Sequence, residues 1–352
     1  MKEQNYHEEV KIKNILRLRE LLKELPPFLE DFFRGISDIT ATRTRIGYAY
    51  DIKIFFHFLT EEITYFMGKN TKDITLGDLD KITATDIEVF MEYLTYYVKN
   101  EDNITFEYQN NEKGKMRKLA ALRTMYNYYF KKEKIETNPS VLVEMPKLHK
   151  KAIIRLELDE IALLLDQVES GDNLTDSQKK FHVYNKKRDL AIVSLLLGTG
   201  IRISECVGLN TQHVDLSMNA IKITRKGGDE SVIYIGDEVA HALELYLQER
   251  EKIAALEGHT DALFISLQRK RLTDRAIQLL VKKYSKLVTN FKNITPHKLR
   301  STYGTNLYRE TGDIYLVADI LGHSDINTTK KHYAEMNEDK RRYAANAIKL
   351  RE

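Results

Sequence analysis

The pattern of apolar residues changes near residue 137, and this change constrains the possible folds more than any other feature of the sequence. Before it, apolar residues recur at helical spacing. After it, helical segments alternate with a short stretch of strand-like pattern. Asn138-Pro139 and Pro146 interrupt the periodicity, and the basic stretch from Lys147 to Arg155 follows. Because 352 residues also exceed one ordinary core, the sequence predicts two domains joined by a linker over 137–155.

The part before the linker is predicted to be helical. It divides into an N-terminal helical extension, residues 1–34, and a helical domain over 35–136. Thr83 and Asp86 resemble a capping box that opens a helix running through Val98. The polar stretch 99–111 is predicted to be a loop. Two further helices are expected, one from about Thr42 to Glu61 and one that carries Met116, Leu119, Leu122, Met125 and Tyr129 at helical spacing.

The part after the linker, residues 156–352, is predicted to combine helices with a small β-sheet. An apolar helix from Arg188 to Leu197 ends at Gly198-Thr199-Gly200, and another begins after Arg202. Alternating apolar residues on both sides of Lys226-Gly227-Gly228 predict a hairpin that turns at the glycines. The expected fold class is therefore mainly α, with a small β-hairpin in the second domain.

Composition is that of a folded soluble protein, with 42% hydrophobic and 30% charged residues. The longest apolar stretch, Leu190 to Leu197, is far shorter than the roughly 20 residues that cross a bilayer. The N-terminus has no apolar segment of a secretory signal, and the single cysteine, Cys206, forms no intrachain disulfide. We expect a cytoplasmic protein without membrane contact, in which Cys206 is a small core residue.

The net charge of +3 does not by itself indicate a nucleic-acid partner. Basic residues are nevertheless concentrated after the linker begins, and local density matters more than the sum. They form five runs, Lys147-Lys150-Lys151-Arg155, Lys179-Lys180, Lys186-Lys187-Arg188, Arg269-Lys270-Arg271 and Lys282-Lys283. A solvated surface would explain any one run, whereas the five together favour an anionic partner.

Several polar side chains stand where apolar packing does not explain them. Arg202 follows the glycine break and Lys226 lies in the glycine turn. His297 and Arg300 follow Pro296 at a spacing of three, which places them on one helix face. The candidate set is Arg202, Lys226, His297, Arg300, His323 and Tyr333. Each also has an ordinary explanation: Arg202 could cap a helix or pair with Glu205, both histidines could stand at helix ends, and Lys226 could be a solvated turn residue.

Together these residue types suit attack on a phosphodiester by a tyrosine hydroxyl. Arginine forks stay cationic and match the non-bridging oxygens, whose negative charge grows in the transition state. A phenol with a pKa of about 10 must lose its proton, and the leaving 5′ oxygen must gain one. Histidine suits the first task and a lysine on a hairpin tip the second. No zinc-like spacing and no Walker-type loop is present, so neither a metal nor a nucleotide cofactor is expected.

Three segments, in this order, resemble the tyrosine recombinase (phage integrase) family, and its Xer-type branch most closely. They are GTGIRISECVGL, ITRKGGDE and TPHKLRSTYGTNLYRETGDIYLVADILGHSDINTTKKHYAEM. The resemblance covers roughly residue 156 to the end. In the first half, TRTRIGYAYDIKIFFHFL and RKLAALRTMYNYYF resemble the family's helical core-binding domain less distinctly. The resemblance implies a site-specific DNA recombinase that needs no cofactor.

Carried over position by position, the resemblance implies a role for each candidate. Arg202 and Arg300 would hold the scissile phosphate, and Glu205 would support the site. Lys226 would protonate the leaving 5′ hydroxyl, and His297 would take the proton of the nucleophile. His323 would donate a hydrogen bond to a phosphate oxygen, and Tyr333 would form the 3′-phosphotyrosyl bond. Ser301 departs from the pattern, since many relatives have a histidine there, but it lies outside the catalytic set.

The resemblance also implies a two-domain clamp on double-stranded DNA. The tail from Asn337 to Leu350, with apolar residues at helical spacing, would dock on a neighbouring protomer. The expected assembly is a homo-tetramer on paired recombination sites, or a hetero-tetramer with a paralogue, which passes through a Holliday junction. Candidate DNA contacts in the first domain are Arg43, Arg45, Lys115, Lys118 and Arg123.

Alternative functions keep some of these features. Xer-type resolution of chromosome dimers is preferred to integration and excision of a phage or transposon, because the extension of about 34 residues is short for a dedicated arm-site-binding domain. A type IB topoisomerase would share the active site but relax DNA without choosing a site. A DNA-binding regulator with an inert site would lack the complete residue set.

Overall fold

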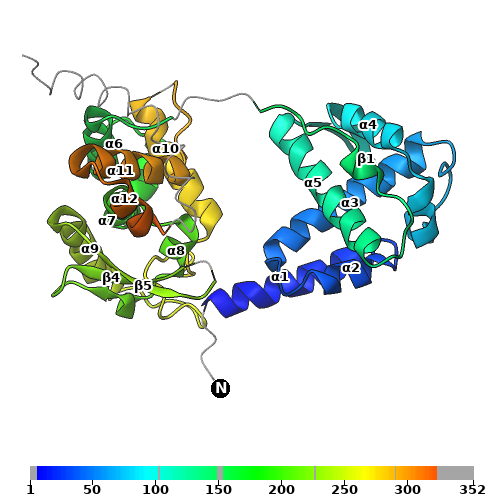
Figure 1. Cartoon of the computed structure of the whole chain (residues 1–352). Coiled ribbons are helices and arrows are strands. Elements are labelled where there is room, and N and C mark those ends of the chain that lie inside the picture. The colour runs from blue at the N-terminus through cyan, green and yellow to red at the C-terminus, as the bar shows by residue number, and fades with distance from the viewer. Residues whose placement is uncertain (1–5, 102–103, 149–153, 226, 290, 323–352) are drawn as a thin grey trace, which may run out of the picture. The chain divides into compact units, whose positions relative to one another are not determined.

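The computed structural model describes residues 6–101, 104–148, 154–225, 227–289 and 291–322, and the chain forms two compact units, Met1–Lys151 and Ala152–Glu352 (Figure 1). The first unit contains the helices α1 (Tyr6–Leu22), α2 (Leu29–Gly35), α3 (Thr42–Glu62), α4 (Ala84–Tyr93) and α5 (Glu112–Lys131). Short 3-10 turns lie at Thr71–Asp73, Leu76–Lys81 and Pro139–Val141, and two strands, β1 (Tyr96–Glu101) and β2 (Ile104–Gln109), complete the unit.

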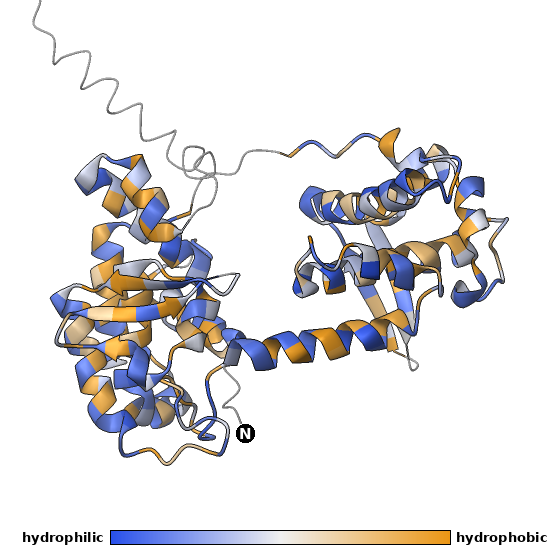
Figure 2. Ribbon diagram, turned by 60° about the horizontal axis from the view of Figure 1, so that its bottom comes forward, coloured by the Kyte–Doolittle hydropathy of each residue, from blue (hydrophilic) through white to orange (hydrophobic). Residues whose placement is uncertain are grey.

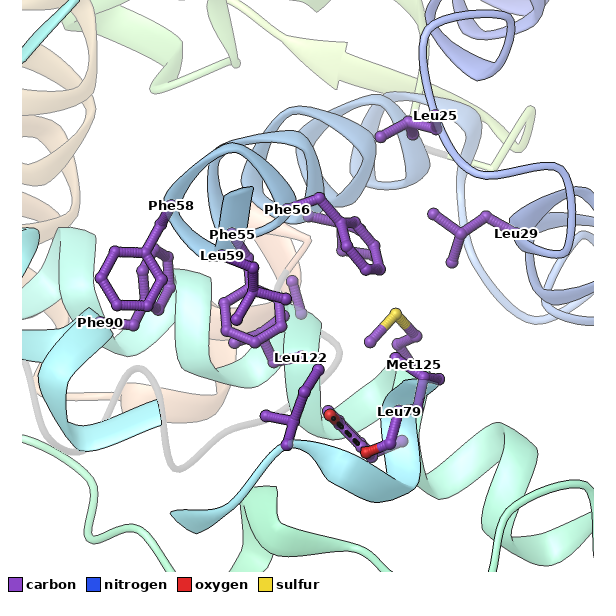
Figure 3. Close-up of a cluster of buried hydrophobic side chains, with 14 of the residues drawn as sticks. Leu25, Leu29, Phe55, Phe56, Phe58, Leu59, Leu79, Phe90, Leu122 and Met125 are labelled. Atoms are coloured by element: carbon purple, nitrogen blue, oxygen red, sulfur yellow. Dashed lines mark hydrogen bonds between the residues drawn. The ribbon is translucent and has the colours of Figure 1, made fainter. Parts of the chain in front are cut away.

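The core of the first unit lies between α3, α5 and the helices around them. Phe55, Phe56 and Phe58 of α3 are fully buried, and Phe90 of α4 packs edge-on against Phe55 (Figure 3). The α3 residues fall at helical spacing, so one face of the helix is buried along its length. As expected, α4 opens with a capping box, in which Thr83 Oγ1 accepts from Asp86 N at 3.2 Å.

The helices of the first 35 residues share this core. α1 packs against α3, and Leu18 and Leu21 are buried there. Figure 2 shows that α1 carries both hydrophobic and hydrophilic residues along its length. Phe32 and Phe33 of α2 are also buried in the same cluster. Residues 6–35 therefore contribute directly to the core of the segment that follows them.

A two-stranded sheet stands where the sequence predicts the end of a helix and a loop. The helix ends at Tyr93, not Val98, and β1 pairs antiparallel with β2 from Tyr96↔Gln109 to Glu101↔Ile104. Aromatic and β-branched residues favour the strands, because they pack across a ladder. The rings of Tyr97 and Tyr108 stack at 5.1 Å between centroids. The predicted loop over 99–111 was therefore wrong.

The second unit is mainly helical and has one small antiparallel sheet. Its helices are α6 (Leu158–Ser170), α7 (Asp176–Thr199), α8 (Ile203–Gly208), α9 (Asp237–Arg250), α10 (Asp274–Val288), α11 (Pro296–Thr311) and α12 (Ile314–Leu321). A 3-10 turn lies at Thr211–His213, and the strands β3 (Val214–Asp215), β4 (Ala220–Thr224) and β5 (Glu230–Tyr234) pair in the order β3-β4-β5. The predicted fold class, mainly α with a small hairpin, is confirmed.

Helix α7 forms the centre of the second unit. It packs against α6, α9 and α11, and its last turns, which hold the apolar run expected there, are almost entirely buried. It ends on Gly200, whose φ of +62° suits glycine, and a Cβ there would lie 2.5 Å from a ring atom of Tyr303. None of the helices in the described ranges is long and apolar enough to span a bilayer.

Candidate active site

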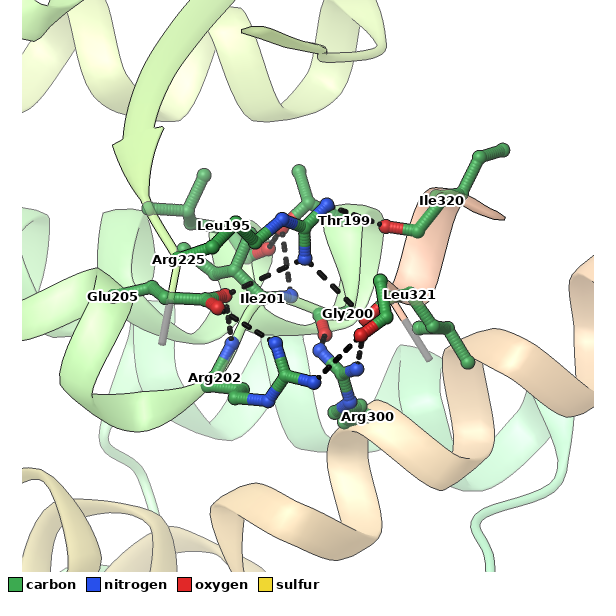
Figure 4. A network of polar contacts seen from close by, with 11 residues as sticks. Leu195, Thr199, Gly200, Ile201, Arg202, Glu205, Arg225, Arg300, Ile320 and Leu321 are labelled. Carbon is green, nitrogen blue, oxygen red and sulfur yellow. Dashed lines mark hydrogen bonds and ion pairs between the residues drawn. The ribbon is translucent and has the colours of Figure 1, made fainter. Parts of the chain in front are cut away.

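The polar cluster of the second unit forms where four segments meet. They are the junction between α7 and α8, the end of β4, the first turns of α11 and the carboxyl end of α12 (Figure 4). Three arginines from the first three segments converge on main-chain carbonyls of the fourth. Residues far apart in the chain are thus brought to one point.

Arg202 is held from two sides by the buried Glu205. Its backbone N–H donates to Glu205 Oε2 at 2.7 Å, and its Nη1 donates to Oε1 at 2.8 Å. Arg202 stands at the N-cap position of α8, but its side chain makes no capping hydrogen bond, so of the two alternatives from the sequence the ion pair with Glu205 is the one present. Its side chain is 32% exposed, whereas Glu205 is almost fully buried. Glu205 therefore fixes a guanidinium that solvent and ligands can reach.

Arg300 lies deeper in the cluster, with 5% of its surface exposed. Its Nη1 donates to the carbonyl of Gly200 at 2.6 Å, and its Nη2 donates to that of Leu321. Pro296 occupies the first turn of α11, where its missing N–H costs nothing. Arg300 therefore ties the end of α7 to the end of α12.

Arg225 is a third arginine of the cluster, and sequence reasoning missed it. Its Nη2 donates to the carbonyl of Ile320 at 2.9 Å, and its Nη1 donates to that of Leu321 at 3.3 Å. The same Nη1 lies 3.8 Å from Glu205 Oε2. The residue stands beside Lys226 in one of the segments that carry the family resemblance, but nothing in the sequence indicates its partners.

The charges of this cluster favour an anion. Among the described residues, the cluster holds three guanidinium groups and one carboxylate, an excess of two positive charges. The carbonyls that they contact belong to the last turn of α12, which carries partial negative charge because these groups have no partner within the helix. Gly322, with φ +60°, accepts from Arg202 Nη2 at 2.9 Å, and a Cβ there would lie 2.8 Å from Arg225 Nη1.

His297 stands exposed in the first turn of α11, whereas Arg300 is buried. It lines a cavity of about 460 Å³ together with Ile203, Arg275 and Lys282. Ile203 directly follows Arg202 in the chain. Ser301, where the sequence departs from the family pattern, donates its hydroxyl to the carbonyl of His297 at 3.0 Å.

Lys226, His323 and Tyr333 lie outside the described residues, as does the tail from residue 337 to residue 350. The residues that flank Lys226 close the turn predicted there. Arg225 N donates to Asp229 O at 2.7 Å, and Gly228 N donates to Arg225 O at 3.1 Å. The positive φ values of Gly227 and Gly228, +114° and +105°, explain why this turn needs glycines.

The candidate DNA contacts of the first unit differ in their surroundings. Arg43 is exposed, and Lys115 donates to Thr95 Oγ1 at 2.6 Å from a partly exposed position. Arg45 donates to Thr42 Oγ1 and to the carbonyl of Phe33.

Two candidates of this group are engaged inside the unit. Lys118 is 4% exposed, its Nζ donates to Asn110 Oδ1 at 2.7 Å, and burial lowers its pKa. Arg123 donates to the carbonyls of Ser140 and Val143. Lys118 is therefore buried away from solvent, and the guanidinium of Arg123 is engaged with main-chain carbonyls as that of Arg45 is.

The described residues contain no group of three or more His, Cys, Asp or Glu side chains that could hold a metal ion. Cys206 is fully buried beneath the site, and burial raises the pKa of its thiol well above the ordinary value. It is a core residue, as expected.

Comparison with known proteins identifies the family of this chain. The model of the phage integrase family matches residues 140–340, more than half of the chain. Tyrosine recombinase XerC of Caldanaerobacter subterraneus subsp. tengcongensis is 33% identical over 345 residues, which cover 94% of this chain and 89% of that protein.

Solved structures share the fold. The XerH site-specific recombinase, bound to a palindromic difH substrate in a post-cleavage complex, superposes with a TM-score of 0.61 at 19% identity over 94% of this chain and 88% of that chain. A lambda integrase tetramer bound to a Holliday junction gives a TM-score of 0.59 at 15% identity over 87% and 76%. This chain therefore belongs to the phage integrase family, as a tyrosine recombinase of the Xer type.

Proposed function

We propose that this protein recombines double-stranded DNA at specific sites, through a 3′-phosphotyrosine formed by Tyr333. The observation that carries the proposal is the convergence of Arg202 and Arg300 at the end of α12. Each arginine reaches a carbonyl at least 100 positions away in the chain, Arg300 that of Gly200 and Arg202 that of Gly322. The charge excess around them complements a phosphodiester.

The chemistry assigns one task to each group. Arg202 and Arg300 present their guanidinium groups to the non-bridging oxygens, and Arg300 also holds the ends of α7 and α12. Tyr333 attacks phosphorus, its proton passes to His297, and the bond from phosphorus to the 5′ oxygen breaks. The leaving oxygen takes a proton from Lys226, and His323 donates a hydrogen bond to the phosphoryl group. The bond energy stays in the phosphotyrosine link, so religation needs no external energy source.

The proposed organisation is an N-terminal extension over 1–34, whose helices share the core of the next segment, a core-binding domain over 35–136, a linker over 137–155 and a catalytic domain over 156–352. Both domains would clamp duplex DNA, with Arg43, Arg45 and Lys115 as contacts of the first. XerH is bound to its difH substrate, and lambda integrase forms a tetramer on a Holliday junction. By this likeness we propose a cytoplasmic protein that acts as a homo-tetramer, or with a paralogue, on paired sites.

Covalent trapping tests the nucleophile. The bound DNA site is first recovered by selection, and a nicked substrate is then made that loses a short fragment on cleavage. Wild-type protein is expected to accumulate covalent DNA, and Tyr333→Phe to form none while still binding the site. Tyr184→Phe, at an exposed position of α7, serves as the matched control and should react like wild type. Covalent DNA with Tyr333→Phe would contradict the assignment.

A second measurement separates recombination from relaxation. A plasmid with two copies of the selected site should yield recombinant products and, at low protein concentration, Holliday junctions. A plasmid that lacks the site should stay supercoiled. Efficient relaxation of this second plasmid would instead identify a type IB topoisomerase.

A further inference from the structure

The side chain of Arg225 attaches the turn between β4 and β5 to the end of α12. Its backbone closes the turn on both sides, since its N–H donates to Asp229 O and its carbonyl accepts from Gly228 N. Its guanidinium reaches away from the sheet to Ile320 and Leu321 (Figure 4). The same residue thus shapes the turn and attaches it to α12.

The attachment is well shielded from solvent. The side chain of Arg225 is 12% exposed, compared with 32% for Arg202, and it donates to two carbonyls while it faces Glu205. Hydrogen bonds from a charged donor in such a place are stronger than those between neutral groups. Losing the side chain would also remove this donor from the carbonyl of Ile320, whereas the carbonyl of Leu321 would keep Arg300. The hairpin tip would then lose its fixed position relative to the α12 end.

Two proposed catalytic residues adjoin this attachment in sequence. Lys226 directly follows Arg225, and His323 directly follows Gly322, whose position leaves no room for a Cβ beside the guanidinium of Arg225. Arg225 itself has no task in the proposed reaction. Its contacts therefore call for a role other than binding the phosphate.

We propose that Arg225 is a positioning residue that holds the Lys226 turn in reach of the leaving group and so sets the rate at which the 5′ oxygen is protonated. This role rests on the proposed function. In the step concerned, the Tyr333 oxygen bonds to phosphorus, the bond to the 5′ oxygen breaks, and that oxygen receives its electron pair together with the Lys226 proton.

A sulfur atom in place of the bridging 5′ oxygen isolates this proton transfer. A thiol has a pKa of about 8.5, against 15.7 for water, so the thiolate leaves without a proton. Single-turnover formation of covalent DNA is measured on both substrates at saturating protein. We expect Arg225→Ala to be slower than wild type by about 10- to 100-fold on the oxygen substrate, within the range of general-acid effects. On the sulfur substrate it should be within about threefold of wild type.

Three further variants define the result. Lys226→Ala should show the same pattern, and adding Arg225→Ala to it should slow the oxygen reaction by less than about twofold, because both act on one step. Arg225→Lys, which keeps a cationic donor, should react at an intermediate rate on the oxygen substrate. If the alanine variant does not fold, Arg225→Lys is compared with wild type on both substrates instead. Lys222→Ala removes an exposed ion pair to Glu230 from the same hairpin and should react like wild type on both substrates.

The outcomes are distinguishable. Equal slowing on both substrates would overturn the positioning role, since it would place Arg225 in phosphate binding or in the fold alone. Unchanged rates on both would show that the attachment does not matter. If wild-type protein forms covalent DNA with neither substrate, the proposed function itself fails, and the role of Arg225 falls with it.

Discussion

Each unit of this protein buries a carboxylate among cations, but the two arrangements serve different ends. In the first unit, Asp51 of α3 lies 2.7 Å from Arg117 Nη1 and 3.8 Å from Lys118 Nζ, both on α5. Burial outweighs these two cations and raises the pKa of Asp51 to about 6. In the second unit, Glu205 accepts from the backbone and the guanidinium of Arg202. The first carboxylate joins two helices, and the second fixes the guanidinium that we propose binds the phosphate.

The comparison shows that burial alone does not mark a functional charge. Asp51 meets one buried lysine and one largely exposed arginine, so the excess there is one positive charge, against two among the described residues of the second cluster. Glu205 meets Arg202 and Arg225 in a cluster that also holds Arg300, and the surplus positive charge is available to an anion. The size of the excess positive charge, and not the presence of a buried ion pair, distinguishes the Glu205 cluster from the Asp51 cluster.

The largest expected effect separates two buried arginines of the second unit. Arg300→Ala should lower the rate of covalent DNA formation by about 10³-fold, because the end of α12 and Arg202 lose their common anchor. Arg250 provides the control, since it is equally buried and also donates to carbonyls, those of Ala262, Thr260 and Ile253. Arg250→Ala should lower thermal stability but leave the cleavage rate of the folded protein within about threefold. Similar cleavage rates for Arg300→Ala and Arg250→Ala would show that the position of Arg300 in the polar cluster gives it no special role in the reaction.

A smaller effect, on stability, tests the first unit. Because Asp51 has a pKa of about 6 in the fold and an ordinary value of 3.8, the folded state binds its proton more tightly. This residue therefore makes the protein less stable as pH rises from about 4 to about 6, and contributes no further change above that. Across this pH range, the contribution of Asp51 to the free energy of unfolding falls by about 3 kcal/mol, at 1.36 kcal/mol per pKa unit.

Urea unfolding of wild type and Asp51→Asn from pH 4 to pH 8 measures this contribution. The variant should lose this dependence. Wild type should therefore become less stable relative to Asp51→Asn as the pH rises from about 4 to about 6. A constant difference across the whole range would show that Asp51 titrates as an ordinary carboxyl.

The smallest expected effect tests the other carboxylate. Glu205→Gln keeps the shape and an acceptor for Arg202 but removes the charge, and it should slow covalent DNA formation by about tenfold, or about 1.4 kcal/mol. Gel shifts should find DNA binding nearly unchanged. Asp51→Asn, the equivalent change in the first unit, should leave the cleavage rate as in wild type. A slower reaction with Asp51→Asn would break the division of roles between the two carboxylates.

The sequence predicted the features that depend on neighbours along the chain. The capping box of Thr83 and Asp86, the glycine turn and the pairing of Arg202 with Glu205 all involve residues a few positions apart. It did not reveal β1 and β2, because a run such as Tyr96 to Val98 is too short to distinguish a strand from the end of a helix.

The sequence also did not predict features that depend on tertiary contacts. Lys118 could be assigned to the surface because lysines usually are, but α5 turns it toward Asp51 and Asn110. Arg225 meets carbonyls some 95 positions away in the chain. No local sequence pattern indicates such a long-range contact.

The carbonyl groups at the end of α12 have an evolutionary consequence. Since the arginines contact main-chain oxygens there, side chains of this helix can vary without changing the groups that are recognised. The length of the helix has no such freedom, because one inserted residue would rotate these oxygens by about 100° around the axis. Natural variants of this segment should therefore tolerate substitutions on its exposed face far better than insertions or deletions.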